Sequence, residues 1–110
     1  MFNINGIDWA ICLVSSNHPA LQKSDKSIAI GSCDNETKTI YIREGLPLSL
    51  MRKVLCHEIT HAAMFSYNIL LTVEQEELLA DLIATYGEEI IYTTNQIFRR
   101  IKKTGDLDVL

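Results

Sequence analysis

The sequence predicts an α+β fold, with short strands first and long helices after them. Apolar and polar residues alternate from Ile7 to Val14, which is typical of a half-buried strand. Apolar residues recur at helical spacing from Leu79 to Ile101, which indicates a long helix near the C-terminus. A small sheet packed against helices is the layer arrangement that buries both kinds of apolar face.

Two further segments, Ser27 to Cys33 and Lys38 to Ile42, are rich in β-forming residues. They flank Asp34-Asn35-Glu36-Thr37, whose Asp and Asn favour turns, so a hairpin is predicted. The polar segment Ser15 to Ser27 has no clear period and reads as a loop with room for one helical turn. The expected sheet therefore has three strands.

The first helix is predicted from about Pro47 to Ser66, with Pro47 in the first turn, where a missing N–H costs nothing. Thr72-Val73-Glu74-Gln75 is a capping-box pattern, so a second helix should start near Val73 and continue to about Lys103. Such a helix would span roughly 46 Å if straight, whereas a chain of this size has a radius of gyration near 13 Å. The helix should therefore bend, most easily at Gly87, or its end should protrude.

Length and composition fit one globular domain spanning residues 1–110. The formal charge of −4 gives no basic face for nucleic acid, and Arg99 to Lys103 suit the negative end of a helix dipole. Three cysteines without a C-x-x-C spacing favour a reducing cytoplasm over a disulfide framework. No segment resembles a signal peptide or a membrane span, so we expect a protein that is neither exported nor embedded.

The most informative motif is H-E-x-x-H at His57-Glu58-Ile59-Thr60-His61, set among apolar residues. On a helix His57 and His61 share one face and can aim ring nitrogens at one metal ion. Glu58 follows at about 100° of rotation, which suits a general base beside the metal rather than a ligand. Buried imidazoles and carboxylates need compensation, and a zinc ion is the first candidate.

A catalytic zinc takes three protein ligands, so a third is required. Glu77 and Asp81 are four apart on the next helix, where Glu77 could ligate zinc and Asp81 could accept a hydrogen bond from a ligating histidine, preferentially His57. Cys56 faces away from the two histidines and is interpreted as a small core residue. Glu74 and Glu76 are interpreted as acidic residues favoured in the first turn of a helix.

The segments Met51 to Ala62 and Glu77 to Ala84, together with the strand Thr39 to Ile42, resemble the ImmA/IrrE-type metallopeptidases. This is a gluzincin-like group that is frequent in phages and mobile elements. The resemblance implies a minimal zincin-like core with zinc on His57, His61 and Glu77, and Glu58 as the base. It further implies hydrolysis of peptide bonds in a regulatory protein, such as a repressor, rather than digestion of bulk protein.

Several alternatives remain open at this stage. The zinc site could belong to a non-proteolytic regulatory or protein-binding module, although the intact Glu58 favours catalysis. The motif could also be a polar helix without metal, satisfied by internal hydrogen bonds. For an oxyanion-stabilising group the candidates are Tyr67, Tyr41 and His18, each of which also has a structural interpretation.

The expected partner is a protein or peptide substrate, held in extended form by the strand Lys38 to Ile42 or by whichever strand lies at the sheet edge beside the cleft. A homodimer through the C-terminal helix is also expected, through Ile97, Phe98 and Ile101.

Overall fold

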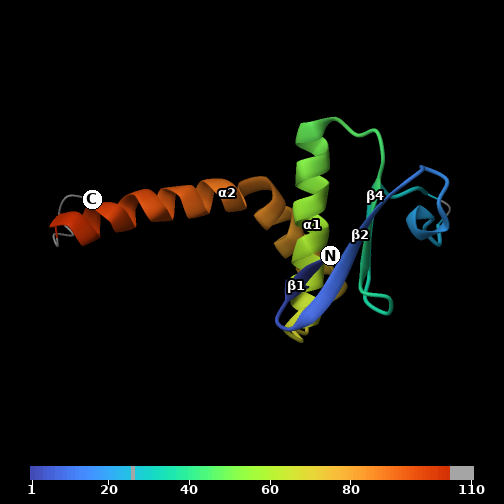
Figure 1. Ribbon diagram of the computed structural model, residues 1–110, viewed down its shortest axis with the longest axis horizontal. Helices are drawn as coiled ribbons and strands as arrows, with labels where there is room; N and C mark the ends of the chain where they lie inside the picture. Colours follow the sequence, from blue (N-terminus) through green and yellow to red (C-terminus); the bar gives the residue numbers. More distant parts are fainter. Residues whose placement is uncertain (26, 105–110) are drawn as a thin grey trace.

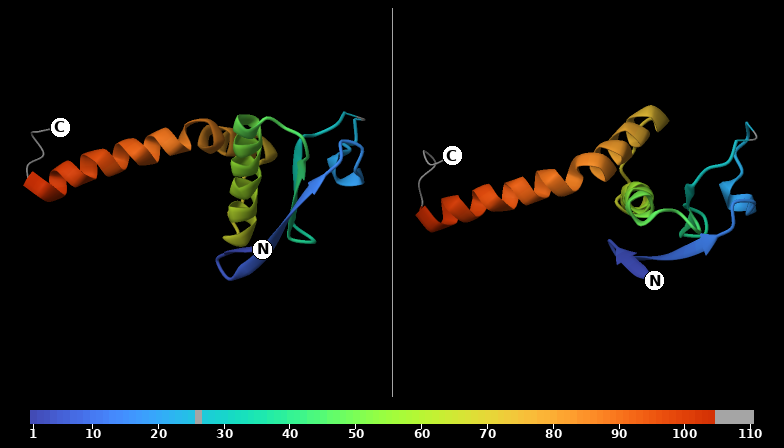
Figure 2. Two further views of the ribbon diagram at one scale, coloured as in Figure 1. Left: turned by 45° about the horizontal axis from the view of Figure 1, so that its top comes forward. Right: turned by 90° about the horizontal axis from the view of Figure 1, so that it is seen from above.

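The computed structural model describes residues 1–25 and 27–104. A four-stranded sheet lies against helix α1, and the first part of helix α2 packs on the other side of α1 (Figure 1). The view from above shows the same three layers, with α1 between the sheet and α2 (Figure 2). The α+β class is therefore confirmed, and α1 is the element that joins the sheet to α2.

The sheet has the order β1-β2-β4-β3, so its two inner strands come from distant parts of the chain. Strands β2 (Ile7–Val14) and β4 (Thr39–Arg43) pair in parallel at its centre. Strand β3 (Gly31–Asp34) pairs antiparallel with β4 and forms one edge. Among the described residues, this order leaves the outer backbone of β3 without a strand partner, at the edge of the sheet where β3 contacts α1.

The prediction of three strands is wrong, because β1 (Phe2–Ile4) adds a fourth, antiparallel to β2. The turn between them consists of Asn5 and Gly6, both at positive φ (52° and 81°). Asn-Gly is the strongest short-range signal for a tight hairpin, since both residues adopt this conformation readily. The signal was present in the sequence, but a three-residue strand before it carries almost no alternation of its own.

The predicted hairpin forms, with shifted strand limits. Strand β3 begins at Gly31 rather than Ser27, and an isolated bridge pairs Gln22 with Ile28 in the segment before it. The Asp34 carboxylate accepts a hydrogen bond from the Glu36 N–H at 2.9 Å, as expected for an Asx turn. The preceding loop contains one short 3-10 helix, Pro19–Leu21.

Helix α1 (Leu48–Ser66) begins one residue later than predicted, with Pro47 as its N-cap. It ends in a Schellman motif, in which Asn68 has a positive φ of 54° and the Ile69 N–H donates to the Met64 carbonyl at 2.9 Å. The motif satisfies carbonyls that the helix end would otherwise leave unpaired. Both ends of the helix that carries H-E-x-x-H are thus defined by backbone chemistry.

Trp9 fixes the C-terminal end of α1 to the sheet. Its side chain is fully buried and its indole N–H donates to the Ser66 hydroxyl at 2.8 Å. The Asn5 side chain donates to the Ser66 carbonyl at 3.0 Å, from the turn between β1 and β2. Around Trp9 the core is formed by Ile40 and Ile42 of the sheet with Ala62 of α1. These contacts place Ala62 and Ser66 of α1 against the sheet. The opposite face of the helix, which carries the two histidines, is therefore turned toward α2.

Helix α2 (Val73–Thr104) starts with the predicted capping box, in which the Thr72 N–H donates to the Gln75 side chain at 3.0 Å and the Gln75 N–H donates to the Thr72 hydroxyl at 3.2 Å. It is continuous through Gly87, but it curves and its second part projects from the body (Figures 1 and 2). The extents of 55 × 31 × 28 Å and a radius of gyration of 17.2 Å reflect this projection. Within the described part of the chain, no helix is long and apolar enough to span a membrane.

Candidate metal centre

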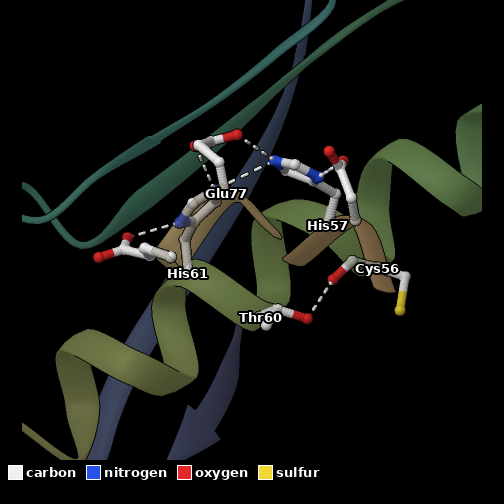
Figure 3. Close-up of polar contacts among 7 residues, drawn as sticks. Cys56, His57, Thr60, His61 and Glu77 are labelled. Atoms are coloured by element: carbon white, nitrogen blue, oxygen red, sulfur yellow. Dashed lines mark hydrogen bonds and ion pairs between the residues drawn. The ribbon is translucent and has the colours of Figure 1, made fainter. Parts of the chain in front are cut away.

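Three of the residues singled out from the sequence meet where α1 and α2 face each other. The Nε2 atoms of His57 and His61 lie 3.1 Å apart. The two carboxylate oxygens of Glu77, from α2, lie 3.2 Å from His57 Nε2 and 3.0 Å from His61 Nε2. Figure 3 shows both imidazoles pointing toward Glu77. One ligand atom from each residue falls within a group whose members are at most 4.8 Å apart, so the three side chains could hold one metal ion.

The outer nitrogens of the two imidazoles face carboxylates. His57 Nδ1 lies 2.9 Å from Asp81 Oδ1, and His61 Nδ1 lies 2.6 Å from Glu76 Oε1. A neutral imidazole carries a single N–H, and a carboxylate can only accept. When each Nδ1 donates outward, both Nε2 atoms present lone pairs to each other and to the Glu77 carboxylate. Such a group of acceptors requires a cation at its centre, supplied either by a metal ion or by additional protons on the imidazoles.

Glu76 lies in the first turn of α2, as interpreted from the sequence, but its side chain also reaches His61 and is only 19% exposed. Glu74, by contrast, is exposed in the same turn. Glu76 lies four residues before the fully buried Ala80 and therefore shares its helix face. The four-residue spacing between Glu76 and a small apolar alanine was a usable signal for this position.

Glu58 lies beside the three converging side chains in a buried position. Its residue is 6% exposed, and among the described residues its Oε2 is a buried side-chain atom without a hydrogen-bond partner. Burial raises the pKa of the Glu58 carboxyl above its ordinary value, while the charges of His61 and His57 oppose the rise. A buried carboxylate oxygen with no protein partner is available to a water or a substrate group.

The close approach of β3 to Glu58 depends on Gly31. A Cβ atom at this position would lie 2.6 Å from Val54 Cγ1 and 3.1 Å from Glu58 Cγ. The absence of a side chain at Gly31 therefore lets the edge strand pack directly on the face of α1 that carries Glu58 and Val54. Sequence reasoning did not identify this role, because Gly31 lies inside a segment that was predicted only as a strand.

A cleft of about 580 Å³ opens beside the site, between the segment leading into β3 and the two helices. Its lining includes His57, Glu58, Glu77 and Asp81. The strand next to it is β3, whereas β4, which covers most of the predicted strand Lys38 to Ile42, lies inside the sheet between β2 and β3. The preference for Lys38 to Ile42 as a peptide-binding edge is therefore corrected, and β3 is the edge that faces the cleft.

The remaining candidates lie outside the converging group. The Cys56 side chain points away from both histidines (Figure 3) and lines a separate groove between α1 and α2. Burial raises the pKa of Cys33 to about 12, with the charges of Glu58 and Glu76 adding to the effect, so this thiol stays protonated.

The three residues considered for an oxyanion-stabilising role have other surroundings. His18 accepts a hydrogen bond from the Ala20 N–H at 3.0 Å and stacks on Tyr41 with the ring centroids 5.3 Å apart. Tyr67 is exposed at the C-cap of α1. In the part of the chain that the structure describes, none of the three lines the cleft beside Glu58.

An H-E-x-x-H helix against a small sheet, with a carboxylate delivered by the following helix, defines a candidate metal centre of the kind found in metallopeptidases. The family model Peptidase_M78, described as an IrrE N-terminal-like domain, matches residues 16–93. The chain therefore belongs to this family, and the resemblance to ImmA/IrrE-type proteins is confirmed. The match covers β3, β4, α1 and the first part of α2, together with the whole candidate site. No curated protein and no solved structure matches the chain.

Replacement of Gly31 by alanine should destabilise the fold, because the new methyl group would overlap Val54 and press on Glu58. Overpacking of this kind costs about 1–3 kcal/mol, measurable by urea denaturation followed through the single tryptophan, Trp9. Ser32→Ala, one position along the same strand, is the matched control and should change stability little. Equal stability of Gly31→Ala and the wild type would contradict the close packing of β3 on α1.

Proposed function

We propose that this protein is a zinc-dependent metallopeptidase whose metal is held by His57, His61 and Glu77. The observation that carries the proposal is the convergence of two imidazole nitrogens and a carboxylate at mutual distances of 3.0–3.2 Å. Ligand atoms 2.0–2.1 Å from a tetrahedral zinc ion lie about 3.3–3.4 Å apart. In this chain each Glu77 oxygen lies near one of the two imidazoles, and one ligand atom from each residue falls within 4.8 Å of the others, so the three residues could hold the ion after a small adjustment.

The ligand count further supports a catalytic rather than a structural zinc. Structural sites are usually closed by four protein ligands, whereas three ligands leave one position for water or substrate. The Glu77 side chain is half exposed, and both Glu77 and the buried Glu58 line the cleft from which a water or substrate could reach the metal. Asp81 and Glu76 would each hold one ligating imidazole in a fixed orientation and tautomer, which is how outer carboxylates support metal sites.

A bound zinc ion would supply Lewis acidity, polarising the scissile carbonyl and acidifying an attacking water. In the proposed reaction Glu58 accepts a proton from that water and later donates it to the leaving amine nitrogen. Its unpartnered Oε2 is the oxygen available to receive the proton. Donation from His57 Nδ1–H to Asp81 and from His61 Nδ1–H to Glu76 would leave both Nε2 lone pairs available to the metal ion.

The substrate is proposed to be an extended peptide segment that pairs with the free edge of β3. Apolar side chains of Ile28, Leu50 and Ala84 line the same cleft, which favours an apolar side chain near the scissile bond. Narrow specificity toward a regulatory protein is the part of the proposal that rests on the family resemblance. All three cysteines are free thiols, which is consistent with action in a reducing cytoplasm.

Cleavage of a diverse peptide pool by the zinc-loaded protein tests this function. Glu58→Gln should lower cleavage by at least about 100-fold, because general acid–base catalysis contributes 10²–10⁴-fold, while zinc stoichiometry stays unchanged. The matched control is Glu74→Gln, an exposed glutamate of α2 outside the cleft, which should retain full activity. Zinc binding without any cleavage that depends on Glu58 would instead indicate a non-proteolytic binding module.

The two outer carboxylates generate a separate prediction on metal affinity. Glu76→Ala and Asp81→Ala should each weaken zinc binding about 10–100-fold, the usual effect of removing a partner of a ligating histidine. Competition titration with a fluorescent chelator measures the affinity, and emission from the buried Trp9 reports whether each variant is folded. Glu74→Ala, with the same loss of charge in the same turn, should bind zinc as the wild type does. An unchanged affinity of folded Glu76→Ala would show that its contact with His61 has no bearing on the metal.

A further inference from the structure

The projecting part of α2 carries large apolar side chains in solvent. Ile90, Ile91, Ile97 and Phe98 are 52, 61, 38 and 59% exposed, although each lies inside a continuous helix. Figures 1 and 2 show this part of the helix extending away from the sheet and α1. These side chains therefore receive no cover from the described body of the protein.

These side chains lie on one face of the helix. Ile91 and Phe98 are seven residues apart, Ile90 and Ile97 lie beside them, and the partly buried Ile101 continues the same apolar stripe toward the tip. Isolated helices of about 12–15 residues are marginally stable in water. A helix that stays continuous to Thr104 while its apolar stripe is uncovered thus indicates an interaction surface for another helix.

The charged residues along the border of the stripe indicate which helix could pair with it. Glu88, Asn95 and Lys102 are spaced by seven residues and follow one flank, running from acidic near the body, through neutral, to basic near the tip. A second α2 in antiparallel orientation would place its Lys102 beside Glu88 and its Asn95 beside Asn95. A parallel copy would bring this flank against the other flank of its partner, where Glu88 and Lys102 do not face each other. We propose that α2 mediates an antiparallel homodimer through this stripe.

The surroundings of Glu88 are compatible with this pairing. Its carboxylate already lies 3.0 Å from Arg52 of α1, but both side chains are largely exposed (76 and 66%), and such surface pairs contribute little. Next to it a groove between α1 and α2 is lined by Cys56, Ala84, Gly87 and Ile91. The tip of the second helix, with its Ile101, would reach this groove.

In this register the two helices overlap over about residues 86–104, a length of about 27 Å. The sheet and α1 of the two copies then lie at opposite ends of the helix pair, because in each copy they are attached to the N-terminal end of the projecting part of α2. The candidate metal centre, on the first turns of α2, stays outside the overlap. The dimer is therefore independent of whether the site binds zinc.

Sedimentation equilibrium of the full chain tests the proposal. The wild type should be a dimer at tens of micromolar, and Lys102→Glu should raise the dissociation constant roughly tenfold or more, because two attractive contacts become repulsive. The double variant Glu88→Lys/Lys102→Glu should recover most of the wild-type affinity, since the intermolecular charges are exchanged together and only the exposed pair of Glu88 with Arg52 is lost. Lys103→Glu is the matched control for charge, because the Lys103 side chain is rotated by about 100° from Lys102, away from the stripe. This variant should leave the dissociation constant of the dimer unchanged.

An aromatic pair of variants tests the apolar stripe in the same way. Phe98→Asp should make the chain monomeric, whereas Tyr92→Asp, on the opposite face of the helix, should not. Burial of Trp9, read from its fluorescence, shows that the body of each variant is folded. A monomeric wild type, an unaffected Lys102→Glu variant or a double variant that fails to recover would each overturn the antiparallel dimer.

Discussion

The packing of α1 against α2 depends on one electrostatic constraint, because three hydrogen-bond acceptor groups face one another between these helices. The Nε2 atoms of His57 and His61 and the Glu77 carboxylate lie about as close as hydrogen-bonded atoms. Because Asp81 and Glu76 engage the outer nitrogens, a cation is needed among the inner ones. Without it, unpaired lone pairs and a carboxylate would face one another between the two helices.

The rest of the fold serves to hold these groups in register. Trp9 and Ser66 fix the end of α1 to the sheet, and the capping box at Thr72 sets where α2 starts. Since Glu76, Glu77 and Asp81 all lie in the first turns of α2, a shift in its start would move all three carboxylates relative to the imidazoles. On the other side of the site, Gly31 allows the edge strand to come down on Glu58 and bury it. Sheet, turn and capping residues thus act on a site to which they contribute no ligand.

Much of this could be read from the sequence, because the decisive signals are local. The i, i+4 spacing of the histidines, the capping box and the acidic pair on the next helix each follow from helix geometry, and the structure brings His57, His61 and Glu77 together as that geometry suggests. Strand β1 escaped notice because three residues are too few for a period, although Asn5-Gly6 was informative. The contact of Glu76 with His61 and the role of Gly31 depend on how separate elements pack, and sequence spacing within one element does not determine that.

The most direct measurement of the central claim is X-ray absorption at the zinc edge of the zinc-loaded protein. Three ligands from His57, His61 and Glu77 should give a first shell of only nitrogen and oxygen at about 2.0–2.1 Å, with the outer-shell scattering of two imidazoles and a remaining position for water. A sulfur shell at about 2.3 Å, imidazole scattering that does not correspond to two histidines, or failure to retain zinc would contradict the account.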